Sequence, residues 1–144
     1  MMLIASMLVV MLGGAIGALG RFGCQEAARR WTSMPGWMAI LLVNIAGSFL
    51  IGLSFGLLQG LEFLDLTKYQ TLVQHLRDAQ GPRMGMLLFV TGVCGGYTTF
   101  STFSLDNLFL FYKRPLHLGF NVIFSVTLAT PAAWGGLVLG GGLA

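Results

Sequence analysis

Residues 92–106, GVCGGYTTFSTFSLD, decide how this chain folds. They lie inside an apolar segment long enough to cross a membrane, yet their glycines and the threonine pair at 98–99 disfavour one continuous helix. Phe100 and Phe103 follow three residues apart, on one helical face, with serine and threonine between them. Irregular backbone at bilayer depth is tolerated only where protein buries it or where it lines a wet cavity. The stretch therefore predicts a third membrane helix that is broken near residues 95–99 and forms a pore or a substrate site.

The rest of the chain has the composition of a protein embedded in lipid. The 144 residues are 56% hydrophobic and 9% charged, with a mean hydropathy of +0.81, which lies outside the range of soluble domains. Four long stretches carry no Asp, Glu, Lys or Arg, and about 20 apolar residues are enough to span a bilayer core. We predict an all-α membrane protein with a single domain, residues 1–144, and four transmembrane helices. The predicted spans cover about residues 2–23, 37–58, 84–112 and 116–139.

The charges lie in the connections between these spans. Residues 60–83 are the one extended polar stretch, with leucines at roughly helical spacing, and predict an interfacial connection, not a second domain. Four spans place both termini on one side of the membrane. The first and third connections then carry five Lys or Arg residues on one side of the membrane, and the second connection carries three on the other side. This difference in positive charge is small and permits insertion in both directions.

The first two spans contain small residues at helical spacing. These are Gly13, Gly17, Gly20, Gly47, Ser48 and Gly52. Such residues allow a neighbouring helix to approach closely. Residues 1–20 lack the basic start and the cleavage motif of a signal peptide, so we expect them to form the first span.

A few polar residues in or beside the spans are candidates for binding. The amide of Asn44, in the middle of the second span, must be paired; it either bonds a neighbouring helix or offers donors to an anion. Arg21 is either an interface anchor or the partner of a buried anion or carboxylate. Asn121 and Ser125 share one face of the fourth span, although hydroxyl groups in such helices also bond their own backbone. The cysteines and histidines lack the spacing of metal ligands, and neither an enzyme nor a partner for nucleic acid is expected.

Three motifs, in this order on a four-span chain, resemble the small fluoride channels called Fluc or CrcB. They are GGAIGALGR (13–21), VNIAGSFLIG (43–52) and GVCGGYTTFSTFSLD (92–106), of which the last is the most specific. The resemblance implies an antiparallel, dual-topology homodimer in the inner (plasma) membrane. It also implies two pores that export fluoride passively, a central structural sodium ion and no organic cofactor.

The resemblance further implies which residues act. The implied fluoride pore residues are Arg21, Asn44, Phe100, Ser101, Thr102, Phe103, Asn121 and Ser125. The edge of a phenyl ring is electropositive, so the two phenylalanines can face an anion without a formal charge. The implied sodium ligands are the backbone carbonyls of Gly95 and Thr98. A helix break frees such oxygens, and two antiparallel copies of the chain supply four of them to one hard cation.

The chain departs from the family pattern at several positions. Asp106 follows the third motif where the family commonly has glutamate, which shortens the reach of the carboxylate. The polar face of the fourth span stops early, because Ala129 takes the next position after Ser125. The connection at residues 60–83 is longer than usual.

Other functions of a four-span protein make different demands on the sequence. A small multidrug exporter needs an embedded carboxylate, commonly in the first span, but residues 1–20 contain none and Glu26 lies beyond Arg21. A fluoride–proton antiporter also needs an embedded titratable group, for which Asp106 is the sole candidate. A non-transporting membrane subunit would explain the small residues but not the sequence TTFSTF.

Overall fold

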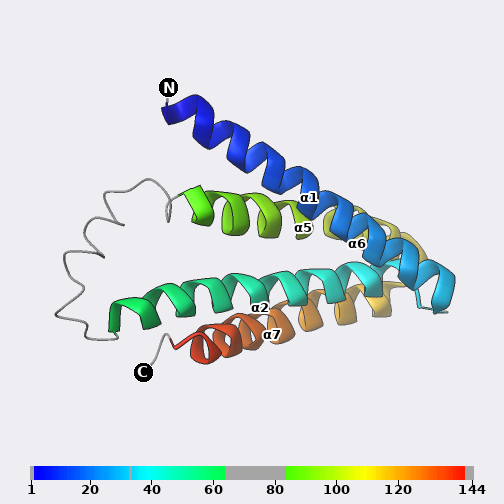
Figure 1. Ribbon diagram of the computed structural model, residues 1–144. Coiled ribbons are helices and arrows are strands. Elements are labelled where there is room, and N and C mark those ends of the chain that lie inside the picture. Colours follow the sequence, from blue (N-terminus) through cyan, green and yellow to red (C-terminus); the bar gives the residue numbers. More distant parts are fainter. Residues whose placement is uncertain (1, 33, 64–83, 142–144) are drawn as a thin grey trace.

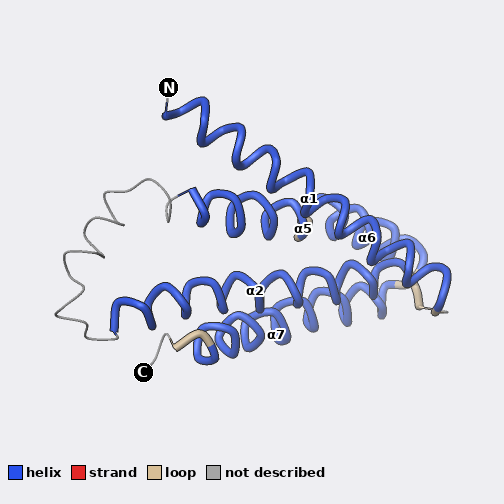
Figure 2. Tube along the Cα trace, in the orientation of Figure 1, coloured by secondary structure: helices blue, strands red, loops and turns tan. Residues whose placement is uncertain are grey.

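The computed structural model describes residues 2–32, 34–63 and 84–141, and every element in this part of the chain is helical (Figures 1 and 2). The helices are α1 (Met2–Trp31), α2 (Gly36–Phe63), η1 (Leu87–Cys94), α5 (Gly95–Tyr97), α6 (Phe100–Lys113) and α7 (Pro115–Leu139). Four helical stretches are long and apolar enough to cross a membrane: Leu3–Trp31, Gly36–Leu57, Met84–Lys113 and Pro115–Leu139. The prediction of an all-α protein with four membrane spans is confirmed. From residue 64 onward, the predicted interfacial connection lies outside the described residues.

Helix α1 is longer than the sequence suggested. Residues 24–31 lie beyond the predicted end of the first span at about residue 23, yet they continue the helix to Trp31. The extension contains no proline and is stabilised by Glu26, whose carboxylate accepts hydrogen bonds from Arg29 at 3.0 and 2.9 Å and from Arg30 one helical turn away. Helix α7 begins with Pro115, a residue suited to the first turn because that turn does not need its N–H.

The third span is broken, as the sequence predicted. A π-helical segment, η1, leads into the short helix α5, and α6 starts after two residues in extended conformation. Thr98 has φ −74° and ψ 155°, and Thr99 has φ −150° and ψ 119°. The break therefore lies at the threonine pair, while Gly95 keeps helical dihedral angles of −64° and −37°.

The helices pack as two pairs, α1 against η1 and α5, and α2 against α7 (Figure 1). Glycines form the contact in the first pair: a Cβ atom on Gly13 would meet the backbone of Leu88, and one on Gly17 would meet that of Val93. A Cβ atom on Gly96 would likewise meet the backbone of Gly14. The close helix contact expected along the first span is thus present. The helix that packs against this span is the N-terminal half of the broken third span.

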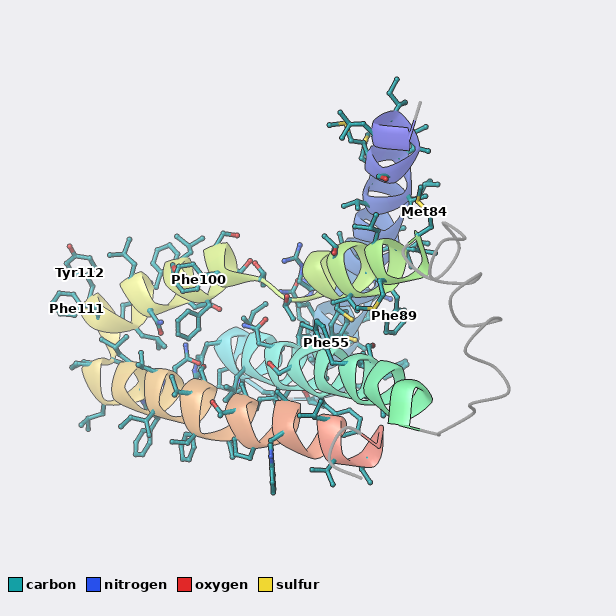
Figure 3. All side chains as sticks on the ribbon, turned by 90° about the vertical axis from the view of Figure 1, so that its left-hand side faces the viewer. Phe55, Met84, Phe89, Phe100, Phe111 and Tyr112 are labelled. Carbon is teal, nitrogen blue, oxygen red and sulfur yellow. The ribbon has the colours of Figure 1, made fainter. Side chains whose placement is uncertain are left out.

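Large apolar side chains cover the outside of the protein. Phe100 is 78% exposed and Tyr112 77%, and Phe111 and Tyr112 project from the end of α6 away from the other helices (Figure 3). The buried apolar residues of the described chain are few, and most lie at the start of α2. A surface of this kind is stable only in contact with lipid or with another protein surface. The chain is a multi-pass membrane protein.

Candidate functional site

Asn44 joins the middle of α2 to the break in the third span. Its Nδ2 donates a hydrogen bond to the Thr99 carbonyl at 3.2 Å, and the Thr99 N–H donates to its Oδ1 at 2.9 Å. Of the two interpretations of this amide, the structure shows the pairing with a neighbouring segment. An amide nitrogen has two hydrogens. The second hydrogen makes no hydrogen bond within the described residues, so Asn44 also retains a donor.

The side chain of Thr99 organises the first turn of α6. Thr99 is 7% exposed, and its hydroxyl oxygen accepts the backbone N–H of Thr102 at 3.3 Å, as an N-cap residue does. The same hydroxyl donates to Thr102 Oγ1 at 3.1 Å and lies 3.2 Å from Ser101 Oγ. Thr99 thus connects the hydroxyl groups of Ser101 and Thr102, two of the pore residues expected from the sequence. This capping role was not predicted from the sequence, although a threonine directly before a helix start is a known N-cap signal.

Replacing Thr99 by valine is expected to lower the free energy of unfolding by about 0.5–2 kcal/mol, because the shape is kept but the cap is lost. Thermal unfolding of the purified protein in detergent measures the change. Thr99→Ser retains the hydroxyl, so its free energy of unfolding should remain near that of the parent protein. Thr127→Val is a matched control, since the exposed Thr127 hydroxyl only bonds its own helix at Ile123 O. Equal stability of the valine and serine variants at position 99 would contradict the capping role.

The break frees the backbone carbonyls of residues 95–98 within the described chain, and those of Gly95 and Thr98 are the first and the last of them. In a continuous α-helix, the N–H groups of Thr99 and Thr102 would bond Gly95 O and Thr98 O, four residues earlier. Here Thr99 N–H donates to Asn44 and Thr102 N–H donates to the Thr99 hydroxyl. Within the described residues, no hydrogen bond reaches Gly95 O or Thr98 O. These are the two residues whose carbonyls the family resemblance assigns to sodium, and free carbonyl oxygens are ligands that a hard cation accepts.

Phe100 and Phe103 form a pair at the start of α6. Their ring centroids lie 5.9 Å apart and the rings are inclined by 37°. Phe100 is largely exposed, Phe103 is half-buried, and Ser101 between them is also exposed. The structure therefore brings the aromatic pair and the hydroxyl cluster together on the side of the break away from η1.

Ser125 and Asn121 of α7 both donate hydrogen bonds within the protein. The Ser125 hydroxyl donates to the backbone oxygen of Asn121 at 2.6 Å, the self-bonding alternative considered from the sequence. Asn121 is 1% exposed, and its Nδ2 donates to Asn107 Oδ1 on α6 at 2.7 Å. Asn107 was not among the candidates selected from the sequence, and its distance of four residues from Phe103 was the available signal.

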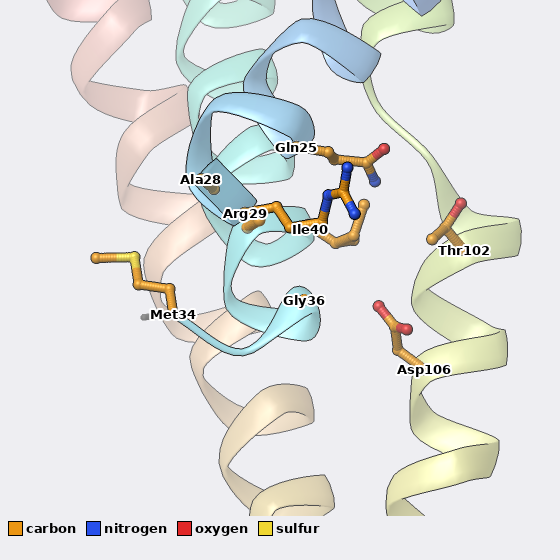
Figure 4. Close-up of a pocket in the computed structure, with 9 residues that line it drawn as sticks. Gln25, Ala28, Arg29, Met34, Gly36, Ile40, Thr102 and Asp106 are labelled. Carbon is orange, nitrogen blue, oxygen red and sulfur yellow. The ribbon is translucent and has the colours of Figure 1, made fainter. Parts of the chain in front are cut away.

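A pocket of about 320 Å³ lies between the end of α1, the start of α2 and α6 (Figure 4). Thr102 and Asp106 point into it from α6, opposite Gln25 and Arg29 of α1. The Oδ2 atom of Asp106 is buried and makes no hydrogen bond within the described residues. The half-buried Arg21 does not line this pocket and has no ion-pair partner among the described residues. Thr102 is thus the one predicted pore residue that reaches this pocket.

Comparison with known proteins gives consistent matches over nearly the whole chain. Residues 8–137 match the family described as CrcB-like protein, Camphor Resistance (CrcB). A protein of Methylococcus capsulatus named fluoride-specific ion channel FluC is 36% identical over 135 residues, 93% of this chain but 52% of that longer protein. Proteins of the same name from Flavobacterium psychrophilum and Agrobacterium fabrum are 33% and 37% identical, over 90% and 92% of this chain and 92% and 93% of theirs. With the three sequence motifs and the broken third span, these matches show that the chain belongs to the CrcB family.

Proposed function

We propose that this chain forms a fluoride-selective channel, not an enzyme, that lets fluoride leave the cell passively. The relatives named above are fluoride-specific ion channels, which supports the substrate. The observation that carries the proposal is the break at Thr98 and Thr99, paired to Asn44, with Phe100 exposed beside it. Broken backbone and polar groups at this depth need a wet path or a protein partner.

The groups around the break suit a small, strongly hydrated anion. A selective pore must replace most of the lost hydration and still let the ion leave. Asn44 has an unused amide hydrogen, Ser101 and Thr102 carry hydroxyls, and the phenyl rings offer electropositive edges. Many weak contacts meet both requirements better than one buried cation would. In this proposal Arg21 adds a positive potential near the entrance, since the described residues provide it with no counter-charge.

We further propose that two antiparallel copies of the chain form the functional unit, with two pores. Gly95 is exposed and a Cβ atom there would come no closer to other groups than 3.9 Å, to Val90 O, so this face is open in a single copy. Free carbonyls on an open face cannot be satisfied by lipid. The weak charge bias between the two sides also permits opposite insertion of two copies.

A structural sodium ion fits between these copies. The carbonyls of Gly95 and Thr98, freed by the side-chain bonds of Asn44 and Thr99, would hold it. No group of three or more His, Cys, Asp or Glu side chains suited to a metal occurs in the described ranges, and the ligands proposed here are backbone oxygens. The bound ion would neutralise the negative ends of these carbonyl dipoles, which otherwise repel one another.

Flux through the purified protein tests the proposal. The protein is reconstituted in liposomes loaded with fluoride, and efflux is recorded with a fluoride electrode and then repeated with chloride. We expect fast fluoride efflux and negligible chloride efflux, without a proton gradient. No fluoride efflux from folded protein would refute the channel and favour a non-transporting subunit. Efflux that requires a proton gradient would instead favour an antiporter, with Asp106 as the titrating group.

Replacing Phe100 by isoleucine is expected to slow fluoride efflux by at least about tenfold, or about 1.4 kcal/mol in the barrier. Isoleucine keeps an apolar side chain but has no electropositive ring edge. Phe109, also on α6 and 54% exposed, provides the control Phe109→Ile, which should transport like the parent protein. Efflux at the parent rate from the Phe100 variant would show that the ring does not contact the ion.

A further inference from the structure

We propose that Asn107 is a further anion-binding residue of the pathway, one helical turn beyond Phe103, and that Asn121 holds its amide in position. This inference rests on the proposed channel function and adds a donor that the family motifs do not include. Its ligand is a small, hard anion that accepts hydrogen bonds. The observations that support it are a shared helix face, an amide pair with a buried Asn121 and the lack of free hydroxyl hydrogens on α7.

Asn107 continues the face of α6 that carries the aromatic pair. Phe100, Phe103 and Asn107 are spaced three and then four residues apart, which places them along one side of the helix. Four residues correspond to a rise of about 6 Å along the axis. An anion that leaves the edge of the Phe103 ring therefore meets the amide of Asn107 next.

The contact with Asn121 determines which end of the Asn107 amide is free. Asn121 Nδ2 donates to Asn107 Oδ1 at 2.7 Å, so the oxygen of Asn107 faces α7. Its NH₂ group then lies on the other side, where it makes no hydrogen bond within the described residues, and Asn107 itself is only half-buried. Accepting a hydrogen bond at the oxygen also polarises the NH₂ group and makes it a better donor.

A purely structural contact between α6 and α7 would not need these two amides. Asn121 is 1% exposed, and its Oδ1 is buried without a hydrogen-bond partner in the described chain. A half-satisfied buried amide destabilises a helix contact relative to an apolar pair of similar shape. Turning both amides by 180° would keep one bond between them but direct Asn107 Oδ1 outward. An anion beside Asn107 favours the observed orientation, because only the NH₂ group can donate to it.

The hydroxyl groups of α7 do not offer an equivalent donor. The hydroxyl hydrogens of Ser125, Thr127 and Thr130 are all directed to backbone oxygens of the same helix. On the face of α6 that carries the aromatic pair, Asn107 is therefore the residue that offers free amide hydrogens one helical turn beyond Phe103.

Fluoride efflux from liposomes tests the assignment with four proteins: the parent, Asn107→Leu, Asn121→Leu and the double variant. Leucine approximates the size of asparagine and removes the amide. We expect each single variant to slow fluoride efflux at least tenfold, with chloride efflux still negligible. If Asn121 acts through Asn107, the double variant should be as slow as Asn107→Leu alone. Thr127→Ala, an exposed position on α7, should transport like the parent.

A direct binding measurement covers the case in which a leucine variant does not fold. In ¹⁵N-labelled parent protein, the side-chain NH₂ signals of Asn107 should shift saturably with sodium fluoride and not with sodium chloride. In Asn107→Ser, which keeps a shorter donor, efflux should be slower than in the parent. Two results would overturn the assignment and leave the channel function intact. One is fluoride efflux at the parent rate from folded Asn107→Leu, and the other is side-chain NH₂ signals that do not shift when fluoride is added. A parent protein without fluoride efflux would refute the function itself.

Discussion

Alanine in place of Asn44 should reduce fluoride efflux at least about a hundredfold, which corresponds to about 2.7 kcal/mol in the barrier. The change removes both partners of the Thr99 backbone, the acceptor at 2.9 Å and the donor at 3.2 Å. Each buried backbone group left without a partner costs about 1–3 kcal/mol, so the extended conformation at the break loses its main support. It also removes the amide hydrogen that remains available to the ion. Efflux from liposomes and thermal unfolding in detergent measure the two effects separately.

Two further variants separate the roles of the Asn44 amide. Asn44→Asp keeps an acceptor for the Thr99 N–H but cannot donate to the Thr99 carbonyl or to an anion, so we expect a folded protein with impaired efflux. Ser54→Ala is the control on the same helix, because the Ser54 hydroxyl only bonds the Leu50 backbone oxygen at 2.7 Å. Efflux near the parent rate in Asn44→Ala would show that the Thr99 pairing does not shape the path.

The sequence allowed the number of spans and a break near residues 95–99 to be predicted, but not which residues within this range leave the helix. Long uncharged runs define the spans because charge is costly in lipid. The glycines suggested where the third helix is weak, yet Gly95 remains helical and Gly96 is used for close contact with Gly14. The helix opens at Thr99 because Asn44, 55 residues away in sequence, takes its hydrogen bonds. Such a partner is set by tertiary packing, which local patterns do not show.

The same limit applies to the candidate site. Residue types and spacing selected the aromatic pair and its hydroxyl neighbours, since these lie within one local motif. The pairing of Asn107 with Asn121 joins two helices across a turn, and each residue alone is an ordinary amide in an apolar segment. The length of α1 was underestimated for a related reason: its last turns are polar, and the hydrogen bonds that Arg29 and Arg30 donate to Glu26 stabilise them as helix.

Two adjacent glycines of α7 should respond oppositely to alanine. A Cβ atom on Gly136 would collide with the Phe49 carbonyl and come within 2.7 Å of the Leu53 N atom on α2, whereas one on Gly135 would meet nothing within 4 Å. Gly136→Ala must therefore push α2 and α7 apart, and overpacking of this kind typically costs about 1–3 kcal/mol. Gly135→Ala should be neutral or stabilising by up to about 1 kcal/mol, because alanine is the better helix former.

Thermal unfolding of the two variants in detergent, beside the parent protein, measures this difference. The comparison is sharp because the same methyl group is added one residue apart, so changes in hydrophobicity and helix propensity cancel. A lower unfolding temperature for Gly136→Ala alone would confirm that the α2–α7 contact limits stability. An unchanged unfolding temperature of Gly136→Ala would mean that α2 and α7 can move apart at little cost in free energy. Loss of stability in Gly135→Ala as well would show that a second protein surface covers the open face of α7, since no group of the described chain lies there.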